Sequence, residues 1–591
     1  MANQPTATGG PDRVPALTTR RTRLESRYPR WSPRRLDEHL DAVAAEFPDR
    51  PYVITDERSW TYRDVRDWSI QIARGLVAAG IRPGEHVAVV LANFPEFVAV
   101  KYGISRAGAT CVPVNFFNRR DELAYVLDQS DAVALITMDS FRGLDYLTML
   151  DELAPGWEQH GGGERLPKLR TVAVFPTSGD QVRDGAPTLS ELASDSETAS
   201  AWQPTQPITE VGPDAAADIL YTSGTTGQPK GVLLTHDMLL RTAYGSAYSR
   251  AFDDAHRILF ALPMYHVFGY VEGMLAATFT GGATVPQLTF DAASTVSAIE
   301  RHRVTDALLI PLMSMAVLDE LDRTRAAGRA ADLSSLTHLL ASGGTPPTGL
   351  WHRIEQAFAG VEITTGYGMS ETTASTTVTR PDDPPRRRLV TNGRLRDVGV
   401  AGDPALGGRL VEYRVVDPVT RAPLERGEVG ELIARGPGVT TGYYRKPDET
   451  ATAFADGEGW LRTGDLGSLD ADDYLTLVGR VKESYRCGGE QVMPKEVEDV
   501  LTAHPSVSQA FVVPLADERM GEVGVAWIVG AETTEHAETE LIEYCAARLA
   551  RFKVPRHVLP IAEADVPTTP SGRPRKFLLA RRAAEQLGAK R

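Results

Sequence analysis

A short segment rich in glycine and hydroxyl side chains lies between two apolar runs at residues 219–236, ILYTSGTTGQPKGVLLTH. Gly224 and Gly227 can adopt backbone conformations closed to other residues, so consecutive N–H groups can point into one concavity. Further donors come from hydroxyl and ammonium groups, those of Thr222, Ser223, Thr225, Thr226 and Lys230. Because phosphate oxygens are charged hydrogen-bond acceptors, this composition predicts a phosphate-binding loop.

The spacing of this segment differs from that of a Walker A loop, in which G-x-x-x-x-G-K-[ST] opens a helix. Here Pro229 precedes Lys230, and the GVLLT that follows is typical of a strand. The residues therefore predict a flexible loop between two strands. An ordinary hairpin rich in glycine and threonine is the alternative at this point.

Seven further segments follow the first in a fixed order. They are LPMYHVFG (262–269), ASGGTP (341–346), TGYGMSE (365–371), GELIARGPGVTTGYYRKPDETATAF (430–454), WLRTGDLG (460–467), GRVKESYRCGGEQVMPKEVE (479–498) and VPTTPSGRPRKF (566–577). Together with residues 219–236 they resemble the motifs of the adenylate-forming enzymes, which include acyl-CoA synthetases, peptide-synthetase adenylation domains and luciferases. The resemblance covers about residue 36 to the end of the chain and is strongest to acyl-CoA synthetases.

This resemblance implies two half-reactions. A carboxylate attacks the α-phosphate of ATP, which gives an acyl-adenylate and pyrophosphate, and the thiol of coenzyme A then displaces AMP. The first step concentrates negative charge and needs cations and fixed donors around the phosphates. ATP, Mg²⁺ and coenzyme A are therefore the expected cofactors and co-substrates.

The resemblance also implies roles for individual residues. Lys230 and the loop 222–226 would hold the β- and γ-phosphates, and Glu371 would bind Mg²⁺ together with Thr222. Ser370 would contact the α-phosphate, and Asp465 would accept hydrogen bonds from the ribose hydroxyls. The expected cofactor-binding set is Thr222, Ser223, Gly224, Thr225, Thr226, Gly227, Gly343, Gly344, Thr345, Tyr367, Gly368, Ser370, Asp465, Arg480, Lys482, Gly488 and Gly489. Within it, residues 343–345 would lie against adenine and Tyr367 would stack on the other side.

The segment 479–498 resembles the hinge of the family. Arg480 would assist ribose binding, and a small C-terminal domain would rotate about Lys482 between the two half-reactions. Gly488 and Gly489 fall in the loop that the family brings to the active site for thioester formation. Side chains there would block the thiol channel.

The acid-binding side is less clear from the sequence. His266 resembles the histidine that the family places near the substrate carboxylate, although a single histidine is more often structural. Tyr265, Phe268 and Tyr270 are expected to line an apolar acyl pocket or to fill the core. No FDxS segment that binds an amino-acid ammonium group is found, which favours a plain fatty or aromatic acid.

One position departs from the family pattern. The family has Gly-Lys in its C-terminal loop, and this lysine bridges the carboxylate and the α-phosphate, whereas this chain has Arg573 after Gly572. Arginine keeps the charge but is planar and bulkier. Arg573 is expected to replace the lysine, and Lys576 is nearby but does not align. A second interpretation is that the activated anion has an unusual size or shape. A third is that the protein binds nucleotide or acyl groups without turnover.

Alternating strand-like and helix-like segments must position these residues. HVAVVLAN (86–93), ATCVPVN (109–115) and DAVALIT (131–137) are typical of buried strands with helical spacing between them, which indicates mainly parallel sheet. After about residue 398, shorter strands with close turns predict a β-rich subdomain. The sequence predicts a basic flexible tail over 1–35, an N-terminal adenylation domain over 36–480 and a mobile α+β domain over 481–591.

Composition excludes several other classes of protein. The chain has 591 residues, 42% of them hydrophobic, and a net charge of −15, so a nucleic-acid partner is not expected. No apolar run approaches the ~20 residues of a membrane span. The first 35 residues contain eight arginines and no apolar signal segment. The three cysteines are far apart, which predicts neither a zinc site nor a disulfide framework and suggests a cytoplasmic protein.

The sequence thus predicts an AMP-forming ligase with Arg573, Lys230, Glu371 and His266 as catalytic residues. Its expected partners are a carboxylic acid and coenzyme A. Transfer to a carrier protein or an amine, including activation of nitrite for diazotisation, is the alternative within the family. A non-catalytic protein that binds nucleotide or acyl groups is the alternative outside it, and the oligomeric state is left open.

Overall fold

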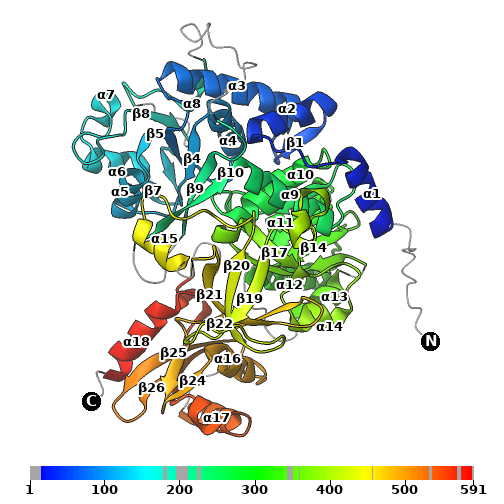
Figure 1. The fold of residues 1–591 in the computed structure, drawn as a ribbon, viewed down its shortest axis with the longest axis vertical. Coiled ribbons are helices and arrows are strands. Elements are labelled where there is room, and N and C mark those ends of the chain that lie inside the picture. Colours follow the sequence, from blue (N-terminus) through cyan, green and yellow to red (C-terminus); the bar gives the residue numbers. More distant parts are fainter. Residues whose placement is uncertain are drawn as a thin grey trace.

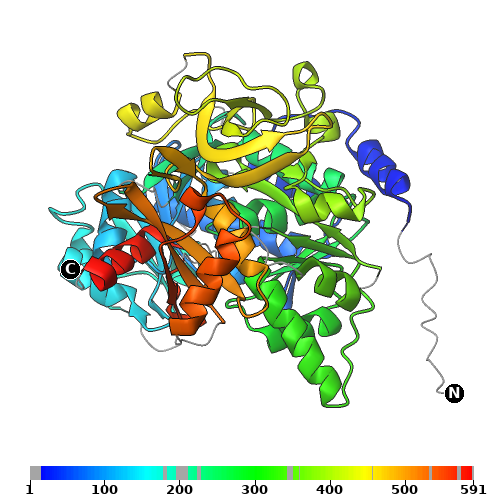
Figure 2. The same ribbon diagram turned by 90° about the horizontal axis from the view of Figure 1, so that it is seen from below.

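The computed structural model describes residues 15–177, 183–194, 211–222, 228–342, 350–358, 360–454, 457–530, 535–568 and 574–588. Figure 1 shows a large α/β body with a smaller domain below it, and Figure 2 shows the same two parts from below. This arrangement of parallel sheets with a separate C-terminal domain confirms the predicted fold class. The proposed boundary at residue 480 stays a prediction.

Two largely parallel sheets form the large body. The first has seven strands in the order β15-β14-β13-β11-β12-β1-β2, and the second has six in the order β10-β9-β4-β3-β5-β8. The strands of the first are β1 (Pro51–Ile54), β2 (Ser59–Thr61), β11 (Arg257–Phe260), β12 (Ala283–Pro286), β13 (Asp306–Leu309), β14 (His338–Ala341) and β15 (Glu362–Thr364). Those of the second are β3 (His86–Val90), β4 (Thr110–Pro113), β5 (Ala132–Met138), β8 (Thr171–Phe175), β9 (Ala216–Thr222) and β10 (Lys230–Thr235). The buried runs read as strands in the sequence are therefore the interior of parallel sheets.

Helices cover these sheets and connect their strands (Figure 1). They are α1 (Leu17–Arg27), α2 (Leu36–Glu46), α3 (Tyr62–Ala78), α4 (Pro95–Arg106), α5 (Arg120–Gln129), α6 (Tyr146–Leu153), α7 (Trp157–His160), α8 (Leu189–Ser194), α9 (His236–Ser249), α10 (Ala276–Thr278), α11 (Ala292–Arg301), α12 (Pro311–Ala326), α13 (Leu350–Ala357) and α14 (Pro385–Val390). Local capping defines several starts: Thr61 accepts the N–H of Asp64 at α3, and Thr235 accepts the N–H of Met238 at α9. A π-helix, η1 (Phe268–Leu275), leads directly into α10.

Smaller antiparallel sheets follow toward the C-terminus. One contains β16 (Gly366–Met369), β17 (Ala374–Val378) and β18 (Arg394–Leu395), and a short hairpin pairs β6 (Ser140–Phe141) with β7 (Leu144–Asp145). The next is the expected β-rich subdomain, with β19 (Glu412–Val416), β20 (Gly430–Arg435), β21 (Leu461–Leu469) and β22 (Leu475–Arg480), flanked by α15 (Pro447–Ala453). The chain then passes into the small domain.

The small domain has its own sheet and its own hydrophobic core. Its strands are β23 (Tyr485–Cys487), β24 (Glu490–Val492), β25 (Gln509–Asp517), β26 (Gly521–Val529) and β27 (His557–Pro560), with helices α16 (Pro494–Thr502), α17 (Glu535–Ala546) and α18 (Lys576–Gly588). Val512 packs on one side of the sheet with Leu541, whereas its neighbour Val513 packs on the other with Leu579. Both clusters are separate from the main cluster of the large body.

The predicted basic tail is wrong for residues 15–35. Residues 17–27 form α1, and the Arg20 guanidinium is 1% exposed, with Nη2 2.6 Å from Glu362 Oε1. Leu24 and Tyr28 are buried beside it. An arginine-rich segment therefore packs here because two apolar side chains enter the core and the buried guanidinium is paired.

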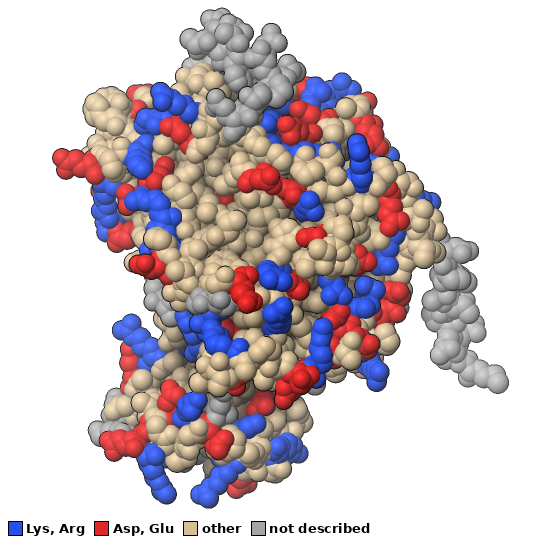
Figure 3. All heavy atoms as spheres, in the orientation of Figure 1, with Lys and Arg blue, Asp and Glu red and all other residues tan. Residues whose placement is uncertain are grey.

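The surface is of mixed charge. On the face seen in Figure 3, lysine and arginine are interspersed with aspartate and glutamate. The three cysteines are free and buried. In the part of the chain that the structure describes, no helix has the length and apolar character needed to span a bilayer.

Candidate active site

A buried tyrosine and a buried aspartate meet a half-buried arginine where β16, β21 and β22 come together. Asp465 of β21 lies opposite Arg480 of β22 in the antiparallel register. The Arg480 Nε donates to Asp465 Oδ1 at 2.9 Å, and the Tyr367 hydroxyl donates to Oδ2 at 2.7 Å. Burial opposes the charge on Arg480, but Asp465 together with Glu483, Tyr367 and Glu371 outweighs burial and raises the pKa of Arg480. Three predicted residues, distant in sequence, therefore form one hydrogen-bonded group.

A second polar group surrounds Glu371, which lies in the short turn of helix at Ser370–Thr372 after β16. The Tyr443 hydroxyl donates to Glu371 Oε1 at 3.0 Å, and Lys230 Nζ lies 4.9 Å from the centre of the Tyr443 ring. Burial raises the pKa of the Glu371 carboxyl. Glu371 and Lys230 are thus brought together by Tyr443, which was not singled out from the sequence although it lies within the matched segment 430–454.

The predicted phosphate loop begins and ends on paired strands. Thr222, the last residue of β9, lies directly opposite Lys230, the first residue of β10. This confirms that the loop connects two strands and not a strand and a helix. Residues 223–227 of the loop lie outside the described residues, as do Gly343, Gly344, Thr345 and Arg573.

Positive charges gather at the end of β22. Lys482 lies in the turn that follows this strand, and Val481 donates its N–H to the Gly464 carbonyl at 2.9 Å. Burial and the nearby charges of Lys230, Arg462 and Arg480 lower the pKa of Lys482. Arg480 and Arg462 are paired with Asp465 and Glu431, and Lys230 and Lys482 add two further positive charges to this part of the site.

The predicted acid-binding residues lie at the start of η1 and in the segment before it. His266 Nε2 is buried and has no hydrogen-bond partner among the described residues. Burial lowers the pKa of His266 to about 4, so the imidazole is neutral at physiological pH. The Tyr265 ring packs 4.5 Å from the His266 ring and 5.1 Å from that of Phe116. Phe268 is half-buried.

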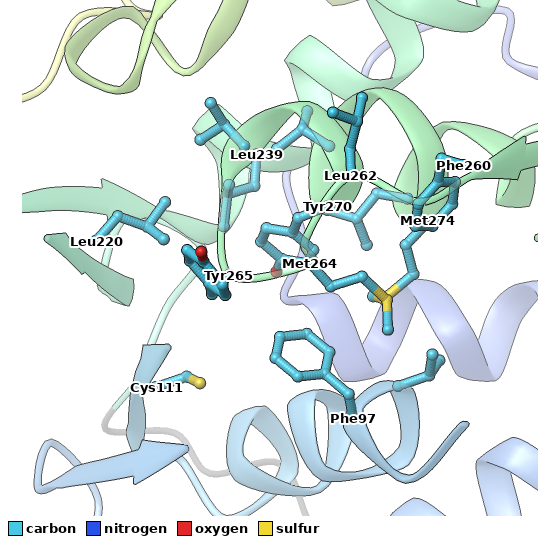
Figure 4. Packing of buried hydrophobic residues seen from close by; sticks show 14 of the residues in the cluster. Phe97, Cys111, Leu220, Leu239, Phe260, Leu262, Met264, Tyr265, Tyr270 and Met274 are labelled. Atoms are coloured by element: carbon cyan, nitrogen blue, oxygen red, sulfur yellow. The ribbon is translucent and has the colours of Figure 1, made fainter. Parts of the chain in front are cut away.

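Tyr270 extends into the core from η1. Figure 4 shows it among Met264, Phe97 and Met274. Its ring centre lies 4.5 Å from the ammonium of Lys101, which forms a buried ion pair with Asp218. Tyr270 and Tyr265 are therefore packed side chains, and their placement in an acyl pocket stays a prediction.

The small domain contributes a tight turn and a buried lysine. Gly488 and Gly489 connect β23 to β24 with φ values of 63° and 91°, a region that favours glycine. A Cβ on Gly488 would lie 2.7 Å from Met520 Cε. The turn geometry thus requires these glycines irrespective of any thiol channel. Lys576, at the start of α18, pairs with Glu483 and Glu498.

A groove lies between the large body and Arg575, the residue that precedes α18. It is lined by the segment 115–122, by side chains of β7 and α6, and by Arg575 of the small domain. Arg120 is paired with Asp121 and Glu152. Within the described chain, Arg119 and Arg575 have no acidic partner. The groove therefore carries two guanidinium groups outside any ion pair of the described chain, together with the carboxylates of Asp121, Glu122 and Glu152, beside the carboxyl end of β4, the neighbour of β9.

Comparison with known proteins relates this geometry to a family. The family described as AMP-binding enzyme matches residues 40–444, and the AMP-binding enzyme C-terminal domain matches residues 496–573. The chain is 31% identical over 523 residues to feruloyl-CoA synthase of Amycolatopsis sp, covering 88% of this chain and 94% of that protein. It is 30% identical over 587 residues to the medium-chain acyl-CoA ligase ACSF2, mitochondrial, of Danio rerio, covering 98% and 93%.

A solved structure shows the same fold. The anthranilate CoA ligase AuaEII in complex with anthranoyl-AMP superimposes with a TM-score of 0.79 at 23% identity, covering 95% of this chain and 99% of that one. The chain therefore belongs to the AMP-binding enzyme family and is an AMP-forming ligase that activates a carboxylic acid with ATP and transfers it to coenzyme A.

Proposed function

We propose that the Tyr367–Asp465–Arg480 group binds the nucleoside of ATP, with Asp465 accepting hydrogen bonds from the ribose hydroxyls. The carboxylate is held from both sides before any ligand arrives. Such a fixed acceptor loses little freedom when the ribose binds. This preorganised carboxylate is the observation that carries the proposal. Residues 343–345 and the Tyr367 ring would enclose adenine, next to Gly368 and Ser370.

The triphosphate would lie among Lys230, Lys482 and the loop 222–227, with Ser370 at the α-phosphate. A buried carboxylate whose pKa burial raises gains charge readily beside a cation, and Glu371 has only the Tyr443 hydroxyl as a side-chain hydrogen-bond partner in the described chain. Hard cations prefer such oxygen ligands. Glu371 and Thr222 therefore fit Mg²⁺, which would neutralise phosphate charge when bound. The role of Tyr443 is to orient the Glu371 carboxylate.

The acid is proposed to be fatty or aromatic, with its carboxylate beside His266. A neutral imidazole can donate one hydrogen bond without adding charge. The ring of Tyr265 beside His266, and that of Phe116 beside Tyr265, support an uncharged acyl tail. The similarity to a feruloyl-CoA synthase and a medium-chain acyl-CoA ligase supports the same substrate classes.

Coenzyme A is proposed to bind its phosphates in the groove between the large body and Arg575. Arg119 and Arg575 provide guanidinium groups from the two domains, and Phe117, 37% exposed, offers a surface for a base. The thiol would then enter past Gly488 and Gly489. Rotation of the small domain at Lys482 would change this groove between half-reactions.

The decisive experiment is pyrophosphate release from MgATP across a panel of fatty and aromatic acids, each with and without coenzyme A. Release that requires an acid and rises with coenzyme A is expected. Acid-dependent release that coenzyme A leaves unchanged would favour a carrier protein or an amine as acceptor. Release with nitrite in place of an acid would favour diazotisation. ATP binding without release for any acid would favour a non-catalytic homologue.

Arg573 is proposed to bridge the acid and the α-phosphate during adenylation. Arg573→Ala should lower acid-dependent pyrophosphate exchange by about 100-fold, because a charge that acts mainly in the transition state is removed. Thioester formation from preformed acyl-adenylate should change less than about threefold. Equal losses in the two half-reactions would contradict this role.

A further inference from the structure

Lys576, the first residue of α18, is held between two carboxylates. Its Nζ lies 2.7 Å from Glu498 Oε1 and 3.3 Å from Glu483 Oε2. The side chain is only 18% exposed. Burial opposes its charge, but Glu498 and Glu483 outweigh burial and raise the pKa of Lys576. The ammonium is therefore engaged by the protein and is not available to replace Arg573.

The two carboxylates belong to parts of the small domain that are distant in sequence from α18. Glu483 directly follows Lys482 and donates its N–H to the Arg480 carbonyl at 3.1 Å, within the turn that follows β22. Glu498 lies on α16, and its Oε1 also accepts the N–H of Val512 in β25 at 2.7 Å. We call these two ion pairs the Glu483–Lys576–Glu498 clasp, and the turn that follows β22 the hinge turn. The clasp therefore joins α18 to the hinge turn and to the core of the small domain.

The same clasp lies at the base of the segment that carries Arg573. Thr568 and Pro574 form an antiparallel bridge, and Arg575 donates its N–H to the Pro567 carbonyl at 2.7 Å. The described ends of this segment, residues 567–568 and 574–575, thus pair with each other and form its base. Lys576 is the next residue, so the clasp fixes this base against the hinge turn.

We propose that Lys576 is a positioning residue that makes the hinge turn and the base of the Arg573 segment move as one body. Rotation at Lys482 then carries Thr568 and Pro574, which flank the Arg573 segment, together with the turn after β22, because Glu483 and Lys576 lie on the same side of the hinge and stay paired. This inference rests on the proposed role of Arg573 in adenylation. Lys576 would affect the reaction only through the position of Arg573.

The test measures the two half-reactions separately in Lys576→Met, which removes the charge and keeps a long side chain. Acid-dependent pyrophosphate exchange should lose about 10–100-fold in kcat, since misplacement of a catalytic group by about 1 Å has effects of this size. The KM for ATP and thioester formation from preformed adenylate should each change less than about threefold. Lys576→Arg should restore most of the exchange rate, because it restores the positive charge.

A matched control is Lys553→Met, which removes another lysine–glutamate pair of the small domain, that with Glu496. Both half-reactions should stay within about twofold of the wild type. If Lys576→Met does not fold, Glu483→Gln tests the same clasp, because Glu498 still pairs with Lys576, and the same selective loss should appear at smaller size.

Loss in both half-reactions, loss in neither, or no recovery with Lys576→Arg would overturn the inference. Failure of the underlying role gives a different result: Arg573→Ala would then leave exchange intact. A selective loss in Arg573→Ala without one in Lys576→Met would remove only the positioning role.

Discussion

The proposed ATP side and the proposed acid side of the site are built in opposite ways. On the ATP side, Asp465 and Glu371 each accept a tyrosine hydroxyl, and Asp465 also accepts from Arg480. On the acid side, His266 Nε2 and the Tyr265 hydroxyl are buried without hydrogen-bond partners among the described residues. One side is a preformed set of polar contacts, and the other is a packed surface.

This difference separates what each side can recognise. Fixed hydrogen-bond acceptors discriminate strongly, because a ligand that lacks the matching donors leaves buried polar groups unpaired. Apolar surfaces discriminate weakly, by about 1–3 kcal/mol for each methylene group. The ATP side is therefore expected to accept one nucleotide, while the acid side tolerates a range of acyl tails.

The largest expected effect is on the ATP side. Asp465→Ala removes two proposed ribose contacts and leaves the Arg480 guanidinium without its carboxylate. Charge-assisted hydrogen bonds contribute about 1.5–3 kcal/mol each, so kcat/KM for ATP should fall by about 100-fold or more. KM for the acid should stay within about threefold. Steady-state kinetics with each substrate varied would check this, and Asp470→Ala, just beyond the far end of β21, is a suitable control.

The pH dependence of kcat/KM should differ between ATP and the acid. Burial raises the pKa of Glu371, so its carboxylate is lost on acidification at a higher pH than an ordinary glutamate, and kcat/KM for ATP should fall as the pH decreases through that value. His266, with a pKa of about 4, stays neutral above pH 5. With an acid that remains ionised, kcat/KM for the acid should show no inflection near 6.5. Such an inflection would mean that His266 is charged in the free enzyme.

The smallest effect is expected from Tyr270→Phe. The change removes a buried hydroxyl that faces the Asp218 carboxylate, which keeps its ion pair with Lys101, so the free energy of unfolding should fall by about 1 kcal/mol. KM for ATP should not change. Urea unfolding and acid-panel kinetics would measure both quantities. A large change in the order of preferred acids would place Tyr270 at the acyl tail.

Sequence reasoning was most successful where a residue type is required by chemistry or by a regular element. The strand pattern located β3, β4 and β5 because interior parallel strands are uniformly apolar. Asp465 and Arg480 were named from their motifs, and the structure pairs them across β21 and β22. The family resemblance, and not the spacing of these residues, supplied their proposed roles.

Long-range packing was not readable in the same way. The local sequence of residues 17–27 does not indicate that Arg20 forms an ion pair with Glu362, more than three hundred positions later. Tyr443 and Lys576 were likewise missed or set aside, because their partners Glu371 and Glu483 become neighbours only through the fold. The acid side could not be resolved for the same reason, since its selectivity depends on the shape left between packed side chains.

The separate hydrophobic clusters of the small domain have a consequence for how this chain can vary. A domain that buries its own apolar residues stays stable in any orientation relative to the large body. Changing that orientation breaks only surface contacts between the two parts. The same independence makes the segment exchangeable. We expect that residues 485–583 can be exchanged between relatives when the junction is placed at the turn after β22. The acid selectivity of such a chimera should be that of the protein that supplies the large body.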